Sequence, residues 1–151
     1  MCDIWPCPSA IVPGIPSTNS LMLRAPKVEL APKPREEISL MEVHDCFSIT
    51  ELVTMEDLHI SDPGNGWRDV LDGRFDADGA IPCQIDGGLK CFGHPIGASG
   101  LRMVYENYLQ LLGRAGDRQV AKPPVFGLSH NLGGMPNQNV SAVVVVGLAG
   151  A

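Results

Sequence analysis

One histidine of this 151-residue chain lies in a glycine-rich stretch, residues 87–100, which reads Gly-Gly-Leu-Lys-Cys-Phe-Gly-His-Pro-Ile-Gly-Ala-Ser-Gly. Glycines allow positive φ angles and close approach of a ligand to the backbone, and Pro95 fits the first turn of a helix. Residues 101–112 have helical apolar periodicity, so His94 is expected beside unpaired helix N–H donors that favour negative charge. This placement favours a catalytic group; the alternative is a turn histidine bonded only to backbone.

Two further groups supply side chains for the same chemistry. In His44-Asp45-Cys46-Phe47, the histidine and the cysteine are two residues apart, so on an extended strand both point to one face. The alternative is a buried strand-end pair, because a free cysteine is often part of the core. The other group is His130-Asn131-Leu132-Gly133-Gly134, whose histidine is either a pocket residue or a structural loop residue. We predict that four side chains converge at one end of the sheet: His44, Cys46, His94 and His130.

Other chemistries fit the sequence less well. The same four side chains are of the types that bind zinc, histidine and cysteine. However, the chain lacks the short paired ligand spacing of zinc sites, and we expect no metal. No G-x-G-x-x-G follows a strand, so the dinucleotide fingerprint is absent. Cys83 and Cys91 are expected to be packing or surface thiols, and His59 a solvated residue at a helix end.

Composition limits the class of protein. The length suffices for one domain with a core, and a net charge of −6 argues against nucleic-acid or anionic-membrane partners. No apolar run is long enough to span a membrane. Five cysteines without a CxxC pair or signal peptide indicate reduced thiols. We therefore expect a cytoplasmic protein.

The chain divides into two parts. Residues 1–35 contain seven of the 13 prolines and are expected to be extended or disordered, whereas residues 36–151 are expected to form the folded domain. Ser48 and Glu51 match a capping box at the start of a helix, and residues 67–86 should be a turn-rich connection. The remaining predicted elements are a strand at 38–43, a helix at 96–112, and strands at 125–130 and 140–148, the last with an apolar run typical of a central strand. Alternating strands and helices predict an α/β fold with helices covering a mixed sheet.

The three histidine-containing groups, in this order, resemble blocks of the thiolase family. The Gly-His-Pro block is shared by many members, and His-Asp-Cys-Phe is similar to the form found in sterol-carrier-protein-type thiolases, where many others have Asn-Glu-Ala-Phe. The His-Asn segment stands where many thiolases have Cys-x-Gly. The resemblance runs from about Pro34 to the C-terminus. It implies an incomplete thiolase-like C-terminal domain, the second half of the family's fold.

The resemblance also implies roles for these residues. The histidine matching His94 activates a nucleophilic cysteine and helps form an oxyanion hole, and the group matching His44 polarises the thioester oxygen through water. Cys46 would move the substrate α-proton, and a coenzyme A thioester would be the substrate, with no covalently bound cofactor. The glycines expected to lie against this substrate are Gly93, Gly97, Gly133 and Gly134.

One departure from the family is the nucleophile, which in thiolases belongs to a Cys-x-Ser block of the N-terminal half. Cys7-Pro8-Ser9 has the spacing, but it lies in the proline-rich segment. We therefore predict part of an acyl-CoA C-acyltransferase that is inactive alone. The alternatives are a non-catalytic thiolase-fold fragment or interaction subunit, and part of a CoA-thioester retro-aldolase with an OB-fold partner protein. The apolar face that such a half leaves uncovered predicts self-association, or binding of a thiolase N-terminal half or of the OB-fold partner.

Overall fold

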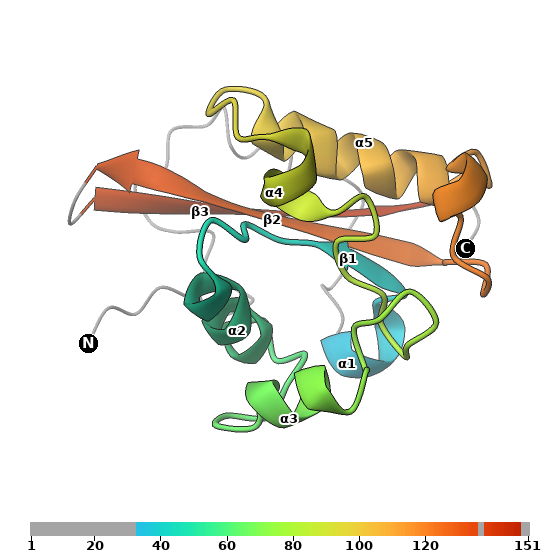
Figure 1. Ribbon diagram of the computed structural model, residues 1–151, viewed down its shortest axis with the longest axis horizontal. Coiled ribbons are helices and arrows are strands. Elements are labelled where there is room, and N and C mark those ends of the chain that lie inside the picture. The colour runs from blue at the N-terminus through green and yellow to red at the C-terminus, as the bar shows by residue number, and fades with distance from the viewer. Residues whose placement is uncertain (1–32, 136–137, 149–151) are drawn as a thin grey trace.

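A three-stranded sheet with helices on both faces forms the centre of this computed structural model, which describes residues 33–135 and 138–148 (Figure 1). Helices α4 and α5 lie on one face, and α1, α2 and α3 lie on the other. The predicted α/β class with a mixed sheet is confirmed. The elements are α1 Pro34–Glu37, β1 Leu40–Glu42, α2 Ser48–Asp57, α3 Gly66–Leu71, α4 Gly88–Phe92, α5 Ser99–Leu111, the 3-10 helix η1 Gly116–Arg118, β2 Phe126–Met135 and β3 Gln138–Gly147.

The strand order is β1-β2-β3, with β1 parallel and β3 antiparallel to β2. The other edge of β1 is also paired: Met41 donates its N–H to Pro82 and accepts one from Gln84. Side chains alternate along β2. Leu128 belongs to a buried apolar cluster that includes Met55 of α2, whereas Ser129 accepts a hydrogen bond from Asn107 of α5.

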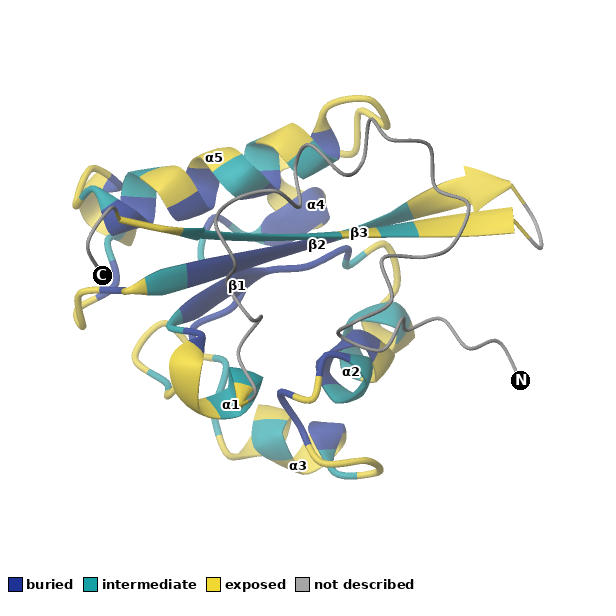
Figure 2. Cartoon of the chain, turned by 180° about the vertical axis from the view of Figure 1, so that it is seen from behind, coloured by how far each residue is buried: buried dark blue, intermediate teal, exposed yellow. Residues whose placement is uncertain are grey.

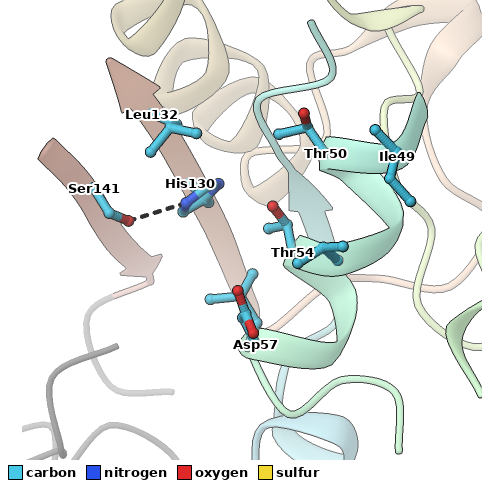
Figure 3. Close-up of a pocket in the computed structure, with 9 residues that line it drawn as sticks. Ile49, Thr50, Thr54, Asp57, His130, Leu132 and Ser141 are labelled. Carbon is cyan, nitrogen blue, oxygen red and sulfur yellow. Dashed lines mark hydrogen bonds between the residues drawn. The ribbon is translucent and has the colours of Figure 1, made fainter. Parts of the chain in front are cut away.

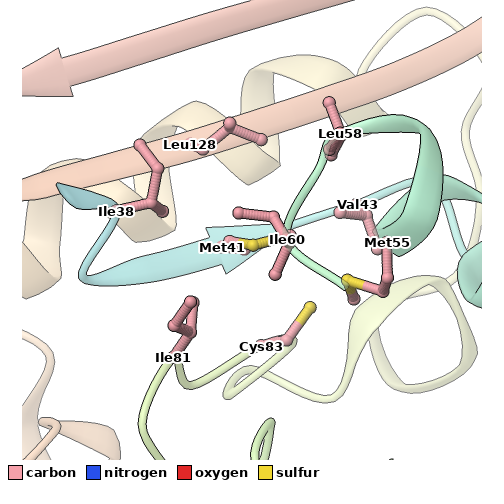
Figure 4. Close-up of a cluster of buried hydrophobic side chains, with 9 residues drawn as sticks. All are labelled: Ile38, Met41, Val43, Met55, Leu58, Ile60, Ile81, Cys83 and Leu128. Carbon is pink, nitrogen blue, oxygen red and sulfur yellow. The ribbon is translucent and has the colours of Figure 1, made fainter. Parts of the chain in front are cut away.

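The two faces of the sheet differ in chemistry. The α2 face has an apolar core (Figure 4) made of Ile38, Met41, Val43, Met55, Leu58, Ile60, Ile81, Cys83 and Leu128. Burial raises the pKa of the Cys83 thiol well above its ordinary value, in keeping with the expected packing role. Under α5 the buried side chains include polar ones, among them Glu106, Asn107 and Gln110. Buried residues make up β1 and much of the first half of β2, whereas the residues of β3 are exposed or intermediate (Figure 2).

Several predicted boundaries are wrong. The capping box does not form, because Ser48 is already helical and the N-cap is Phe47, without a side-chain hydrogen bond. The connection at 67–86 contains most of α3, and the glycine-rich stretch contains α4. Pro34 begins a short helix instead of belonging to extended chain, as its fixed φ allows; the predictions for residues 1–32 lie outside the described part.

The C-terminal strands also differ from the prediction. Strand β2 continues through Gly133 and Gly134 instead of ending at His130, because its hydrogen-bonded pairing with β3 extends to Met135 and Gln138. Within residues 33–135 and 138–148, β3 pairs with β2 alone and is an edge strand, not a central one. No helix in this part of the chain is long and apolar enough to cross a membrane.

Candidate functional site

Two of the predicted histidines face each other. The ring centroids of His44 and His94 are 5.0 Å apart, in an edge-to-face arrangement with an interplanar angle of 75°. His44 follows the end of β1 and is buried, whereas His94 lies in the loop between α4 and α5 and is exposed. The structure therefore brings together two side chains that are 50 residues apart in the sequence.

Each ring of this pair is held through its Nδ1 atom. His44 Nδ1 lies 2.8 Å from Oδ1 of Asn131 on β2. His94 Nδ1 lies 2.7 Å from Oγ of Ser99, the buried first residue of α5. Neither Nε2 atom has a hydrogen-bond partner among the residues that the structure describes. The pair thus presents two ring nitrogens that are free to meet another molecule.

His130 lies on the opposite face of β2 from Asn131, so the prediction that all three imidazoles converge is wrong. Because β2 does not end at His130, consecutive side chains point to opposite faces. His130 lines a cavity of about 230 Å³ between α2 and the β2–β3 hairpin (Figure 3). Its Nε2 lies 3.0 Å from Oγ of Ser141, and its buried Nδ1 has no hydrogen-bond partner in the part of the chain that the structure describes. Burial, with a smaller contribution from His44, lowers the pKa of His130 to about 4.

Cys46 is exposed between β1 and α2. Its Sγ lies 3.9 Å from Oγ1 of Thr50 in the first turn of α2. Within the described ranges the structure shows no hydrogen bond between this thiol and either ring of the histidine pair. The proton-transfer role implied for Cys46 therefore stays a prediction.

Asp45, which no sequence pattern indicated as a site residue, connects the His44-Asp45-Cys46-Phe47 segment to the glycine-rich stretch. Its carboxylate accepts the N–H of Leu89 at 3.0 Å, at the start of α4. The neighbouring Gly88 has a φ of +62°, and a Cβ atom there would collide with this carboxylate. Asp86 accepts the N–H of Gly88 at 2.8 Å. In the sequence this contact is indicated only by the acidic Asp45 beside His44 and by the Gly87-Gly88 pair. The fold is needed to show that the two segments meet.

A buried ionic group connects the same segments. Arg102 of α5 donates from Nη1 to Glu42 at 3.1 Å and also to Asp86. Both carboxylate side chains are 1% exposed. Burial raises the pKa of Glu42 to about 8, and the attraction of Arg102 opposes this effect. Arg102 thereby links α5, which follows the loop of His94, to β1 and to the segment before α4.

The four predicted substrate-contacting glycines lie in two places. Gly93 and Gly97 are exposed in the loop that carries His94, and a Cβ atom at either position would meet nothing within 4 Å. Of these two glycines, Gly93 has a positive φ, of 78°, and Gly97 does not. Gly133 and Gly134 lie within β2, and Gly134 has a φ of 127° with the backbone of Gln138 close by. The expected glycine loop after the strand is thus the end of a hairpin.

Comparison with known proteins places this arrangement in a family. A family model described as thiolase C-terminal domain-like matches residues 28–145. An acetyl-CoA acetyltransferase of Methanothermobacter thermautotrophicus is 47% identical over 98 residues, which cover 65% of this chain and 25% of the relative. Human sterol carrier protein 2 is 43% identical over 97 residues, covering 64% and 18% respectively. A solved structure, an Ltp2–ChsH2(DUF35) aldolase, has a TM-score of 0.64 and 19% identity over 89% of this chain and 32% of its own.

The chain belongs to the thiolase family and has the fold of its C-terminal domain. It is similar to acetyl-CoA acetyltransferases and to sterol carrier protein 2. The matched region spans about a quarter of the length of these acetyltransferases, and less of sterol carrier protein 2.

Proposed function

We propose that this chain supplies the histidine side of a thiolase-type active site for an acyl-CoA thioester, as part of an acyl-CoA C-acyltransferase. The observation that carries this proposal is the His44–His94 pair, with rings 5.0 Å apart and with both Nε2 atoms free within the described chain. The similarity to acetyl-CoA acetyltransferases supports the substrate class. No covalently bound cofactor is part of the proposal.

In this proposal the nucleophilic cysteine comes from a thiolase N-terminal half. His94 accepts the proton of that cysteine, whose sulfur attacks the thioester carbonyl carbon. The bond between that carbon and the coenzyme A sulfur then breaks, and the released sulfur receives the proton from His94. His44 polarises the carbonyl oxygen through a water molecule, which stabilises developing negative charge. Cys46 removes or returns the α-proton of the second substrate.

Gly93 and Gly97 are proposed to contact the substrate, since both are exposed in the loop that carries His94 and have open space around them. Gly133 and Gly134 are also proposed to contact the substrate, but their position within β2 of the hairpin supports this role less. His130 is proposed as a neutral pocket residue on the α2 face, because burial lowers its pKa to about 4.

A partner is part of this proposal. Exposed large apolar side chains lie at the start and on the surface of α2, namely Phe47, Ile49 and Val53, and exposed apolar patches mark interaction sites. The proposed partner is a thiolase N-terminal half, and a second copy or an OB-fold protein are alternatives. The described cysteines Cys46, Cys83 and Cys91 are free thiols, which fits the proposed cytoplasmic compartment.

Complementation tests the function. The chain is co-purified with the portion of the Methanothermobacter acetyltransferase that precedes the matched region, and cleavage of acetoacetyl-CoA by coenzyme A is measured. We expect no turnover by the chain alone and turnover by the complex. His94→Ala should lower the rate by about 10²–10⁴-fold, whereas the exposed His59→Ala control should not.

Three results would count against the proposal. Turnover by the chain alone would show that the nucleophile has been misassigned. A stable complex without turnover would favour the non-catalytic fragment. Cleavage of a 3-hydroxyacyl-CoA in place of acetoacetyl-CoA would favour the retro-aldolase, whose fold-level support is the likeness to the aldolase structure.

A further inference from the structure

We propose that Asn131 and Ser99 are positioning residues that hold both facing imidazoles in the Nδ1–H tautomer, so that each presents an unprotonated Nε2. This inference deepens the proposed function and rests on it for its catalytic meaning. The tautomers themselves follow from the hydrogen-bond donors and acceptors that surround the two Nδ1 atoms, all of which belong to this chain. They can therefore be measured without a partner or turnover.

The His44 tautomer follows from the chemistry of an amide oxygen. Oδ1 of Asn131 only accepts hydrogen bonds, and it lies 2.8 Å from His44 Nδ1. The hydrogen in this bond must therefore belong to His44 Nδ1, and a neutral ring then has a lone pair on Nε2. Since His44 is buried, loss of this bond would not be fully compensated by water.

The His94 tautomer follows from the single hydrogen of the Ser99 hydroxyl. Oγ of Ser99 lies 3.2 Å from the carbonyl oxygen of Pro95, four residues earlier, and 2.7 Å from His94 Nδ1. Serine commonly donates to the carbonyl at i−4 in this way. A carbonyl only accepts, so both bonds exist together only if the hydroxyl hydrogen points to Pro95 and His94 Nδ1 donates to Oγ.

This arrangement suits the two roles proposed for the pair. An unprotonated Nε2 on His94 accepts the proton of an approaching thiol, whereas the other tautomer would present a hydrogen to it. An unprotonated Nε2 on His44 accepts one hydrogen of a water molecule, whose second hydrogen is then free for a thioester oxygen. The partner of a ring nitrogen sets which nitrogen carries the proton, and here both partners belong to this chain.

Nitrogen-15 NMR of the full chain, labelled at histidine, tests the proposal at a pH of about 9, where a histidine of ordinary pKa is neutral. Long-range proton–nitrogen spectra distinguish the two tautomers of each ring, and the chain has only four histidines to assign. We expect His44 and His94 to be protonated mainly at Nδ1. The exposed His59 serves as the internal reference for the tautomer ratio that water imposes.

Variants identify the positioning residues. Asn131→Ala should move the His44 tautomer ratio toward that of His59 by about fivefold, the effect expected from one hydrogen bond, and Ser99→Ala should do the same for His94. Asn131→Asp and Ser99→Thr keep the acceptor oxygen and should restore the Nδ1–H form. Ser141→Ala, which removes the partner of His130 on the other face, should change neither ring of the pair.

The unsubstituted chain alone can overturn the proposal, even if a variant fails to fold. A dominant Nε2–H form at His44 or His94 would refute it, as would tautomer ratios that do not respond to alanine at Asn131 and Ser99. Failure of the proposed function is a separate result, because it is measured as absent turnover in the complemented complex. An Nδ1–H pair in a complex without turnover would leave the positioning roles intact.

Discussion

The Glu42→Gln variant tests whether a buried carboxyl group folds in its protonated form. Glu42 and Asp86 are both buried and share one cation, the Nη1 group of Arg102. Asp86 also accepts the N–H of Gly88, whereas Oε1 of Glu42 is buried without a hydrogen-bond partner among the described residues. Burial accordingly raises the pKa of Glu42 to about 8 in spite of Arg102.

The pH dependence of the free energy of unfolding follows from the pKa of Glu42 in the folded and in the unfolded chain. In the unfolded chain Glu42 has its ordinary pKa of 4.5, so between pH 4.5 and about 8 the folded state binds more protons. The free energy of unfolding must therefore fall as pH rises through this range. At about 1.4 kcal/mol for each pH unit, the full loss is at most about 5 kcal/mol, a large part of the roughly 5–15 kcal/mol of a typical domain.

The cleanest window is pH 6.5 to 8, where the fall is expected to be about 2 kcal/mol. Urea unfolding at several pH values in this window, followed by circular dichroism, gives the slope. Glu42→Gln removes the titrating group and should flatten it. The control is Glu36→Gln, at an ion pair whose side chains are both 66% exposed, and it should keep the slope. An unchanged slope in Glu42→Gln would refute the protonated buried carboxyl.

Three further predictions concern the segments around the histidine pair. Gly88→Ala should lower the free energy of unfolding by at least about 1–2 kcal/mol, because the position has a positive φ and a Cβ atom there would collide with Asp45. The control Gly97→Ala, in open space, should change the free energy of unfolding by less than about 0.5 kcal/mol. Equal changes in urea unfolding would contradict this prediction. Asp45→Ala should cost about 1–2 kcal/mol and speed amide hydrogen exchange at Leu89, and unchanged exchange would contradict the anchor. His130 should titrate by NMR with a midpoint of about 4. Because this value lies below the ordinary 6.5, the free energy of unfolding should fall as pH falls from 6.5 to 4, and His130→Gln should remove that loss; a midpoint near 6.5 would contradict the burial.

Local sequence patterns predicted the elements that depend on local information. The apolar periodicity after residue 100 corresponds to α5, and the valine-rich run at 143–146 lies in β3. The same run did not reveal that β3 is an edge strand among the described residues, because pairing depends on distant segments. Ser48 and Glu51 have the capping-box spacing, yet the helix begins one residue too early for it to form.

The site was predictable only in part, for the same physical reason. Family blocks indicated His44 and His94, and the structure brings them together. Their partners come from afar: Asn131 is 87 residues from His44, and Leu89 is 44 residues from Asp45. The sequence also did not show that β2 continues past His130. Consecutive side chains of a strand point to opposite faces of the sheet, so this continuation decides to which face His130 points.

The hydrogen bonds that hold the two histidine rings are all made by residues of this chain, so the pair does not need a partner to be ordered. Asn131 and Ser99 hold the rings, and Asp45 and Arg102 connect the segments that carry them. Cys46, in contrast, is exposed, and its one hydrogen bond within the described residues is a long one to Thr50. A partner that covers α2 would therefore meet a preformed histidine pair and would mainly change the surroundings of the thiol. Preorganised groups contribute most to catalysis because they need little rearrangement during the reaction, so the ring geometry of the pair should stay the same when a partner binds.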